Sequence, residues 1–356
     1  MPTFPDGFDV EAGQLAFARG SAPDSHAIIR ATPEDFVVNE RLDIEHTGEG
    51  EHLWIELRKT NWTTPQIASH LAKHFELQVR DIGYSGLKDR RAVTRQWFSM
   101  PTPRGGADTN DDLPVIPGIE WLQQHRHSRK LRRGTHQANA FVLNLTDFSG
   151  NREQLELDLV RIREQGVPNY FGEQRFANGR NIEAAQRLFK GARLKRTARS
   201  MALSATRSLL FNAVLSHRVN DGTWNKLLPG EAVMLNGSHS VFPMPDSEDE
   251  REGLEVRVQS QDVHPSGPLP GIGNPVCHAD VAELEENLCA QYPELLDGLK
   301  RFGVKQARRA LRVRPQELQW SWAQPDLLTL SFSLPTGVFA TTLLRECLRA
   351  VEPERT

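Results

Sequence analysis

The spacing of apolar and polar positions predicts β-strands at both ends of the chain. Alternating apolar residues and turn-rich separators favour strands over residues 27–32, 36–42, 52–59 and 92–100. Near the C-terminus, residues 317–322 and 327–334 show the same pattern, with Leu328, Leu330, Phe332 and Leu334 on one face. The chain therefore begins and ends in sheet.

Between these ends, apolar residues recur every three or four positions, which is typical of helices. Thr64 is expected to cap a helix that has Pro65 in its first turn, and Gly166 to close a helix marked by Leu155, Leu159 and Ile162. Residues 197–219 read as one long helix. The pattern predicts a surface loop at 101–118 and a mostly helical segment at 166–313, which includes a hairpin at Asn236-Gly237 and a Pro/Gly-rich stretch at 266–275. A sheet domain interrupted by a helical one gives an α+β fold.

Charge is segregated along the 356 residues, although 43 Lys and Arg nearly balance 46 Asp and Glu. RHSRKLRR (126–133) and KRFGVKQARRALRVR (300–314) contain no acidic residue. Each run is either a solvated helix face or a local basic surface that meets a nucleic-acid backbone. The net charge of −3 excludes the strongly basic composition of many nucleic-acid binders.

The three cysteines form no Cys-x-x-Cys pair, and no His-rich or Cys-rich spacing supports a metal site. The first residues lack the basic and apolar regions of a secretion signal, and no stretch approaches the roughly 20 apolar residues of a membrane span. These features predict a cytoplasmic protein that has no membrane contact.

Asp89 stands alone among cations in GYSGLKDRRAVTRQWFS (83–99). One interpretation is an Asx residue that shapes a turn. The other is a carboxylate that its basic neighbours keep ionised, as a nucleophile or an electrostatic stabiliser requires. Position alone leaves both open.

Three aromatic residues and one amide are further candidates. Asn139 and Phe141 share a face of a predicted strand, so an amide that can pair with a base edge would lie beside a ring. The alternative is a core Phe with a capping Asn. Phe36 is either strand core or a stacking platform, and Phe339 either lies at a pocket mouth or forms a hydrophobic staple.

Six motifs occur in an order that resembles the TruD family of tRNA pseudouridine synthases. They are GLKDRRAVTRQWFS, RGTHQANAFVLNL, VPNYFGEQRF, SATRSLLFN, PLPG and LPTGVFATTLLRE. The resemblance runs from about Thr32 to Glu346, nearly the whole chain. One departure is Ala177, where the family usually has Gly after the third motif.

The resemblance implies a V-shaped protein with a mixed-sheet pseudouridine-synthase domain at 1–165 and 314–356 and a family-specific helical insertion at 166–313. It implies that Asp89 is the catalytic nucleophile, that Phe36, Asn139 and Phe339 contact the substrate, and that Phe141 lies under the flipped base. The substrate would be uridine 13 in the D arm of tRNA, and the protein would act as a monomer without metal or cofactor. Arg129, Lys130, Arg132 and Arg133 would contact the RNA backbone.

The chemistry leaves three routes open, namely attack of the carboxylate on C1′, formation of a glycal, or attack on uracil C6. Two other functions compete with isomerisation. One is a non-catalytic RNA-binding or chaperone role, in which Asp89 only shapes a turn. The other is hydrolysis of a small nucleoside through Asp89, which the basic runs do not favour.

Overall fold

The computed structural model describes residues 15–45, 47–102, 113–245 and 247–353. The first residues of the chain and most of the loop predicted at 101–118 therefore lie outside the described residues. Two compact units are present. The sheet unit comprises Asp24–Arg152, Pro315–Gly337 and Arg349–Thr356, and the helical unit comprises Met1–Pro23, Glu153–Arg314 and Val338–Leu348. The helical unit thus includes 153–165 and 338–348 as well as the predicted insertion, and the boundaries of a catalytic domain stay a prediction.

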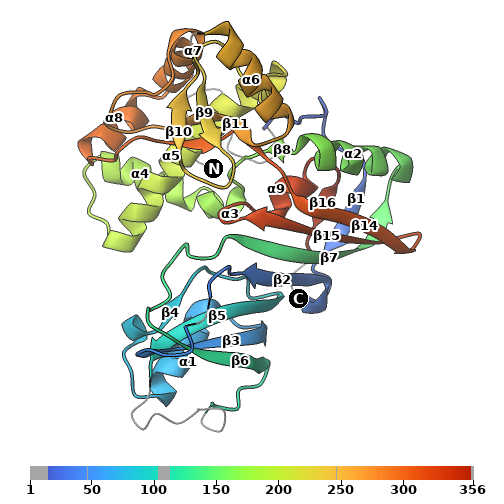
Figure 1. Cartoon of the computed structure of the whole chain (residues 1–356), viewed down its shortest axis with the longest axis vertical. Coiled ribbons are helices and arrows are strands. Elements are labelled where there is room, and N and C mark those ends of the chain that lie inside the picture. The colour runs from blue at the N-terminus through green and yellow to red at the C-terminus, as the bar shows by residue number, and fades with distance from the viewer. Residues whose placement is uncertain (1–14, 46, 103–112, 246, 354–356) are drawn as a thin grey trace. The chain divides into compact units, whose positions relative to one another are not determined.

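The sheet unit is built on one mixed sheet in which strands from both ends of the chain are neighbours (Figure 1). Its main path has the order β14-β15-β7-β2-β5-β3-β6, while β1 joins β7 to β16 and β4 pairs with β5. β2 runs parallel to β5, and β1 to β16; the other pairs are antiparallel. The strands are β1 (His26–Ile29), β2 (Phe36–Arg41), β3 (His52–Thr60), β4 (Gly83–Tyr84), β5 (Val93–Pro101), β6 (Ile119–His127), β7 (Ala138–Ser149), β14 (Gln316–Gln324), β15 (Leu327–Pro335) and β16 (Arg349–Val351).

One helix, α1 (Thr64–His74), covers part of this sheet. Ile67 and Leu71 of α1 are buried with Leu57 of β3 and Phe98 of β5 in a single apolar cluster. The helix begins one residue earlier than the sequence predicts, because Thr63 is the cap: its hydroxyl accepts from the amide of Gln66. The predicted cap, Thr64, is fully buried and has another role, described below.

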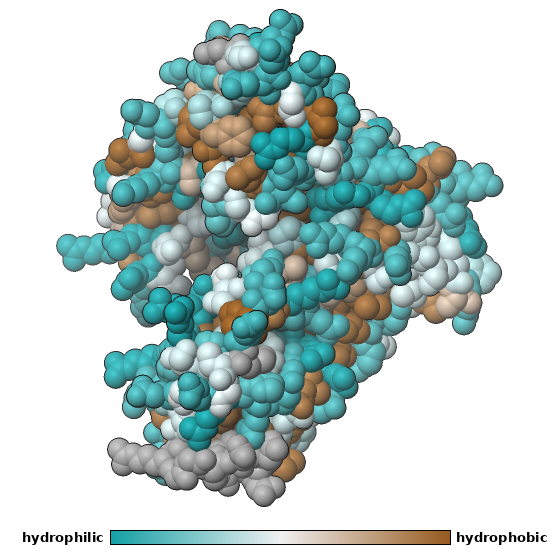
Figure 2. Space-filling model, in the orientation of Figure 1, coloured by the Kyte–Doolittle hydropathy of each residue, from teal (hydrophilic) through white to brown (hydrophobic). Residues whose placement is uncertain are grey.

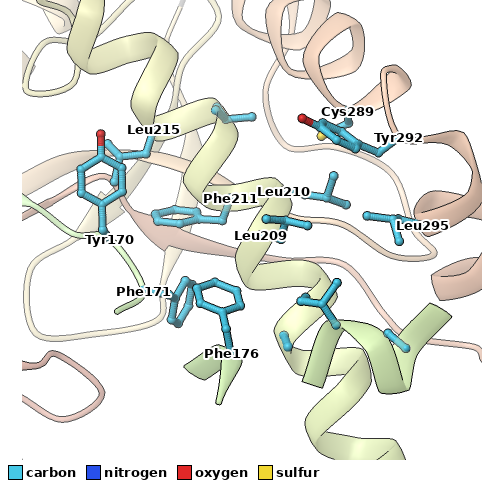
Figure 3. Packing of buried hydrophobic residues seen from close by; sticks show 14 of the residues in the cluster. Tyr170, Phe171, Phe176, Leu209, Leu210, Phe211, Leu215, Cys289, Tyr292 and Leu295 are labelled. Atoms are coloured by element: carbon cyan, nitrogen blue, oxygen red, sulfur yellow. The ribbon is translucent and has the colours of Figure 1, made fainter. Parts of the chain in front are cut away.

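The helical unit packs around its longest helix, α5. Figure 3 shows residues of α5 between Phe171 and Phe176 on one side and Tyr292 and Leu295 on the other, all in one buried cluster. α5 also contacts β11, the strand shared by β9 and β12. The elements are α2 (Arg152–Gln165), β8 (Val167–Pro168), α3 (Glu173–Phe176), α4 (Arg180–Phe189), α5 (Arg196–Asn220), β9 (Ala232–Leu235), β10 (Val241–Pro243), α6 (Glu248–Gln259), β11 (Val263–Leu269), α7 (Ala279–Ala290), α8 (Pro293–Arg301), β12 (Ala307–Ala310), β13 (Arg312–Val313) and α9 (Ala340–Leu344).

The hairpin predicted at Asn236-Gly237 is confirmed, since β9 and β10 pair on either side of it. Several strands were not expected from the sequence, and β6 and β11 are the longest of them. β11 contains Pro265 and Pro268, and β6 is rich in Gln and His. The face shown in Figure 2 is mostly hydrophilic, with apolar residues in scattered groups. Within the described residues, no helix is both long and apolar enough to span a membrane.

Candidate active site

Asp89 lies on the loop of residues 85–92, which joins β4 to β5 and is called the Asp89 loop here. Its carboxylate is 54 % exposed and accepts a hydrogen bond from the guanidinium of Arg30 at 2.9 Å. Arg30, just after β1, is buried and lies over the ring of Phe36, 3.8 Å from its centroid. The same guanidinium also contacts Glu352 at 2.5 Å. An accessible carboxylate is thus fixed beside one cation and one aromatic ring.

The cations next to Asp89 in the sequence bind elsewhere, which corrects the expectation that they surround its carboxylate. Lys88 donates to Glu40 at 2.9 Å, and both side chains are buried. Arg90 and Arg91 donate to backbone carbonyls, of Asn61 and Ala31 respectively. The charge that meets the carboxylate comes from Arg30, a residue far away in the sequence.

Buried polar groups anchor the Asp89 loop at both ends. At its start, the Ser85 hydroxyl accepts from the amide of His136 and lies 2.5 Å from the Nδ1 atom of that residue. Gly86 is required next, because a Cβ there would lie 2.8 Å from the His136 ring. At its end, the amide of Lys88 donates to the Thr64 hydroxyl, and the Lys59 ammonium donates to the carbonyl of Asp89 at 2.8 Å.

His136 is neutral at physiological pH. Burial, together with the smaller effect of the nearby Lys88 charge, lowers its pKa to about 4. A neutral imidazole has one donor and one acceptor nitrogen, and its Nε2 atom lies 3.4 Å from the side-chain nitrogen of Asn139. His136 therefore connects the start of the Asp89 loop to the amide that the sequence selected.

Asn139 and Phe141 share one face of β7, as the sequence predicts. In register, Phe141 lies between Val38 of β2 and Phe332 of β15. The Phe141 ring stacks on Phe332 with centroids 5.3 Å apart and meets Phe36 edge-on at 6.2 Å. Phe36 and Phe141 are both buried. Arg30 contacts both Asp89 and the Phe36 ring, so a chain of contacts connects Asp89 to this pair of rings.

The oxygen of the Asn139 side chain is buried without a hydrogen-bond partner among the described residues. Phe339 belongs to the helical unit and is described within that unit alone. There it occupies the N-cap position of α9 with extended backbone angles and is half-buried. Its contact with the substrate stays a prediction.

The first basic run lies on the surface of the sheet unit. Arg129, Arg132 and Arg133 are exposed, and Lys130 is half-buried. Arg133 lies over the ring of Tyr84, 3.9 Å from its centroid, and Lys130 donates to the carbonyl of Arg80. These cations are accessible to a polyanion.

The second run forms neither a helix face nor a basic surface over its whole length. Arg308 pairs with Glu285 at 2.5 Å, and both side chains are largely buried. Arg312 is buried and donates to the carbonyl of Val258. These arginines connect strands β12 and β13 to the rest of the helical unit. Across the described parts of the chain, no group of three or more His, Cys, Asp or Glu is arranged to hold a metal ion.

Sequence reasoning missed four functional candidates, namely Arg30, Lys59, Glu40 and His136. One signal could have found Lys59: it follows Leu53, Ile55 and Leu57 at alternate positions, so it belongs to the buried face of β3. Nothing local marks Arg30, because its partner lies 59 residues away.

Comparison with a solved structure concerns the fold alone. A solved structure from Methanosarcina mazei, named as tRNA pseudouridine synthase D, superposes with a TM-score of 0.71 at 19% sequence identity. It covers 94% of this chain and 96% of that chain. The sheet unit and the helical unit are thus parts of a known α+β fold with a mixed sheet.

Sequence similarity identifies the family. The sequence model of the family tRNA pseudouridine synthase D (TruD) matches residues 20–191 and 185–347. The tRNA pseudouridine synthase D of Aeromonas hydrophila is 44% identical over 96% of this chain and 96% of its own length. That of Hydrogenovibrio crunogenus is 39% identical over 95% of this chain and 96% of its own. The chain therefore belongs to the tRNA pseudouridine synthase D family, a family of isomerases.

Proposed function

We propose that the protein converts uridine 13 in the D arm of tRNA to pseudouridine, with Asp89 as the catalytic nucleophile. The observation that carries this proposal is a half-exposed carboxylate on a loop anchored at both ends by buried groups. A fixed carboxylate loses little entropy when it meets a ribose. The six ordered sequence motifs and the family membership support the substrate.

The reaction breaks the bond between N1 and C1′, rotates the uracil and joins C5 to C1′. In the simplest route, the Asp89 carboxylate attacks C1′ and the uracil leaves as an anion, which returns through C5 and expels the carboxylate. The proton at C5 is then lost and N1 gains one, so that no oxidant or reductant is consumed. Formation of a glycal and attack on C6 remain alternatives in which Asp89 is also essential.

The target uridine must leave its stack before Asp89 can reach the ribose, which costs a few kcal/mol. We propose that Phe141 lies under the flipped base, that Asn139 pairs with the edge of the base, and that Phe36 and Phe339 contact the substrate. Arg129, Lys130, Arg132 and Arg133 would bind phosphates and offset the cost of flipping.

We also propose that the protein acts in the cytoplasm as a monomer. Its three cysteines support the compartment, since all are free and buried. Thiols of this kind persist in reducing surroundings.

Asp89→Asn tests the proposed role of Asp89. This substitution keeps the size of the side chain but removes its charge and its nucleophilic oxygen. The variant should fold and bind tRNA but release no tritium from tRNA that contains [5-³H]uridine. Asp326→Asn, in the exposed turn between β14 and β15, is the matched control and should retain turnover. Substantial turnover by a deamidation-free preparation of Asp89→Asn would exclude Asp89 as the nucleophile.

A further inference from the structure

Lys59 is a buried cation that the chemistry described so far does not use. It lies near the end of β3, and its side chain is completely inaccessible to solvent. Its ammonium donates to the backbone carbonyl of Asp89 at 2.8 Å. Contact with substrate is excluded in this arrangement, so any influence on the reaction passes through Asp89.

Stability does not account for a lysine at this position. Burying an ammonium costs several kcal/mol unless partners offset the loss of water, and apolar residues of similar volume are often equally stable or better. The residues at alternate positions before Lys59 on the same face of β3 are Ile55 and Leu57, so a Met would continue the pattern. A costly charge beside a candidate nucleophile indicates a functional requirement.

The surroundings of Lys59 explain how its charge is tolerated. Its partners in register are Thr94 of β5 and Ile119 of β6, which carry no charge. The charged groups that act on it are Asp89, which favours the ammonium, and Lys88, which opposes it. Lys88 is itself paired with Glu40. The Asp89 carboxylate is therefore the negative charge that favours the protonated form of Lys59.

We propose that Lys59 is a positioning residue for Asp89. Its ammonium fixes the carbonyl of Asp89 at the rim of the sheet and thereby sets the direction of the carboxylate toward the ribose. This inference rests on the proposed role of Asp89 and adds a second residue on which the rate depends.

The pH dependence of turnover follows from the burial of Lys59. Burial lowers its pKa from 10.5 to about 8, so the ammonium loses its proton as the pH rises through about 8. The unfolded chain still binds that proton up to 10.5, which means that this titration raises the stability of the fold between those values. A decline in turnover near pH 8 is therefore not caused by unfolding through Lys59.

The test compares Lys59→Met with Lys73→Met, which makes the same substitution on the exposed surface of α1. Turnover of tRNA by Lys59→Met should fall about 10- to 100-fold, because small displacements of a reacting group have effects of this size. Its affinity for tRNA and its melting temperature should stay close to those of the wild type. The decline of turnover near pH 8 should be absent in Lys59→Met and present in Lys73→Met.

Wild-type turnover by Lys59→Met would overturn the inference. So would a loss of turnover that disappears when rates are expressed per folded molecule, since Lys59 would then only support the fold. Asp89→Asn, measured in parallel, separates this failure from that of the proposed function. An inactive Asp89→Asn with a fully active Lys59→Met rejects the role of Lys59 alone, whereas an active Asp89→Asn rejects the role of Asp89.

Discussion

Two acid-free basic runs look alike in the sequence and differ in the structure. Residues 126–133 expose most of their cations on the sheet unit, whereas residues 300–314 bury Arg308 and Arg312 within the helical unit. Arg308 pairs with Glu285, a residue of α7 that precedes the run. A count of charges within one segment cannot reveal a partner outside it. The first run is thus available to RNA, whereas Arg308 and Arg312 of the second run stabilise the fold.

Breaking the Arg308 pair tests this contrast with the largest expected effect. Arg308→Met leaves the buried carboxylate of Glu285 without its cation and should cost about 3–5 kcal/mol of folding free energy. Urea unfolding measures this loss. Arg314→Met, at the exposed end of the same run, is the control and should change stability little. If Arg308→Met lost less than about 1 kcal/mol, the Arg308–Glu285 pair would contribute no more to stability than an exposed ion pair does.

Acid should also weaken the region of the second run. The ring of His264 lies 3.1 Å from the Arg312 guanidinium. Burial, together with the smaller effect of the Arg312 charge, lowers the pKa of His264 to about 4. The unfolded chain binds a proton near pH 6.5 and the folded chain only near 4, so stability falls as the pH falls between these values. The loss approaches about 3 kcal/mol. His264→Gln should show a smaller decrease between pH 7 and pH 4.5 in urea unfolding, and an equal decrease would contradict this assignment.

Neutralising the first run should affect binding instead of stability. Replacement of Arg129, Lys130, Arg132 and Arg133 by Gln removes up to four phosphate contacts. Because each contact contributes roughly 0.7 to 0.9 to the slope of log K against log salt, the slope should fall by up to about 3. Titration of tRNA binding between low and moderate salt measures it, and an unchanged slope would remove this run from the RNA footprint.

Asn139→Ala should give the smallest change of the four and one confined to turnover. A pocket amide orients the base without supporting the core, so turnover should fall about ten-fold at a near-normal melting temperature. Activity and thermal unfolding are measured on the same preparation. A loss of activity that parallels a loss of stability would show that Asn139 only supports the fold.

Periodicity predicted the elements whose packing repeats regularly. α5, β3 and β15 occur where the pattern placed them, because each buries one continuous face or stripe. β11 was missed because proline cannot donate a backbone hydrogen bond, so its two prolines argue against a strand in the middle of a sheet. The strand forms because its first half pairs with β9 and its second half with β12.

The candidate site was predicted only where local sequence defines it. Asp89, Asn139 and Phe141 each lie in a compact sequence motif. Strand periodicity also predicts that Asn139 and Phe141 lie on the same face of β7. Arg30 and Lys59 reach Asp89 through tertiary contacts that no spacing in the sequence reports. The one-residue shift of the helix cap has the same origin, since Thr64 is used by Lys88 and Gln96 instead.

The most direct test of the central claim is to map pseudouridine in tRNA from cells that lack this gene. The account predicts that position 13 carries uridine in these cells and that the wild-type gene restores pseudouridine there. The gene for Asp89→Asn should not restore it, although the variant protein accumulates to the same level as the wild type. Pseudouridine at position 13 in cells complemented with Asp89→Asn alone would contradict the account.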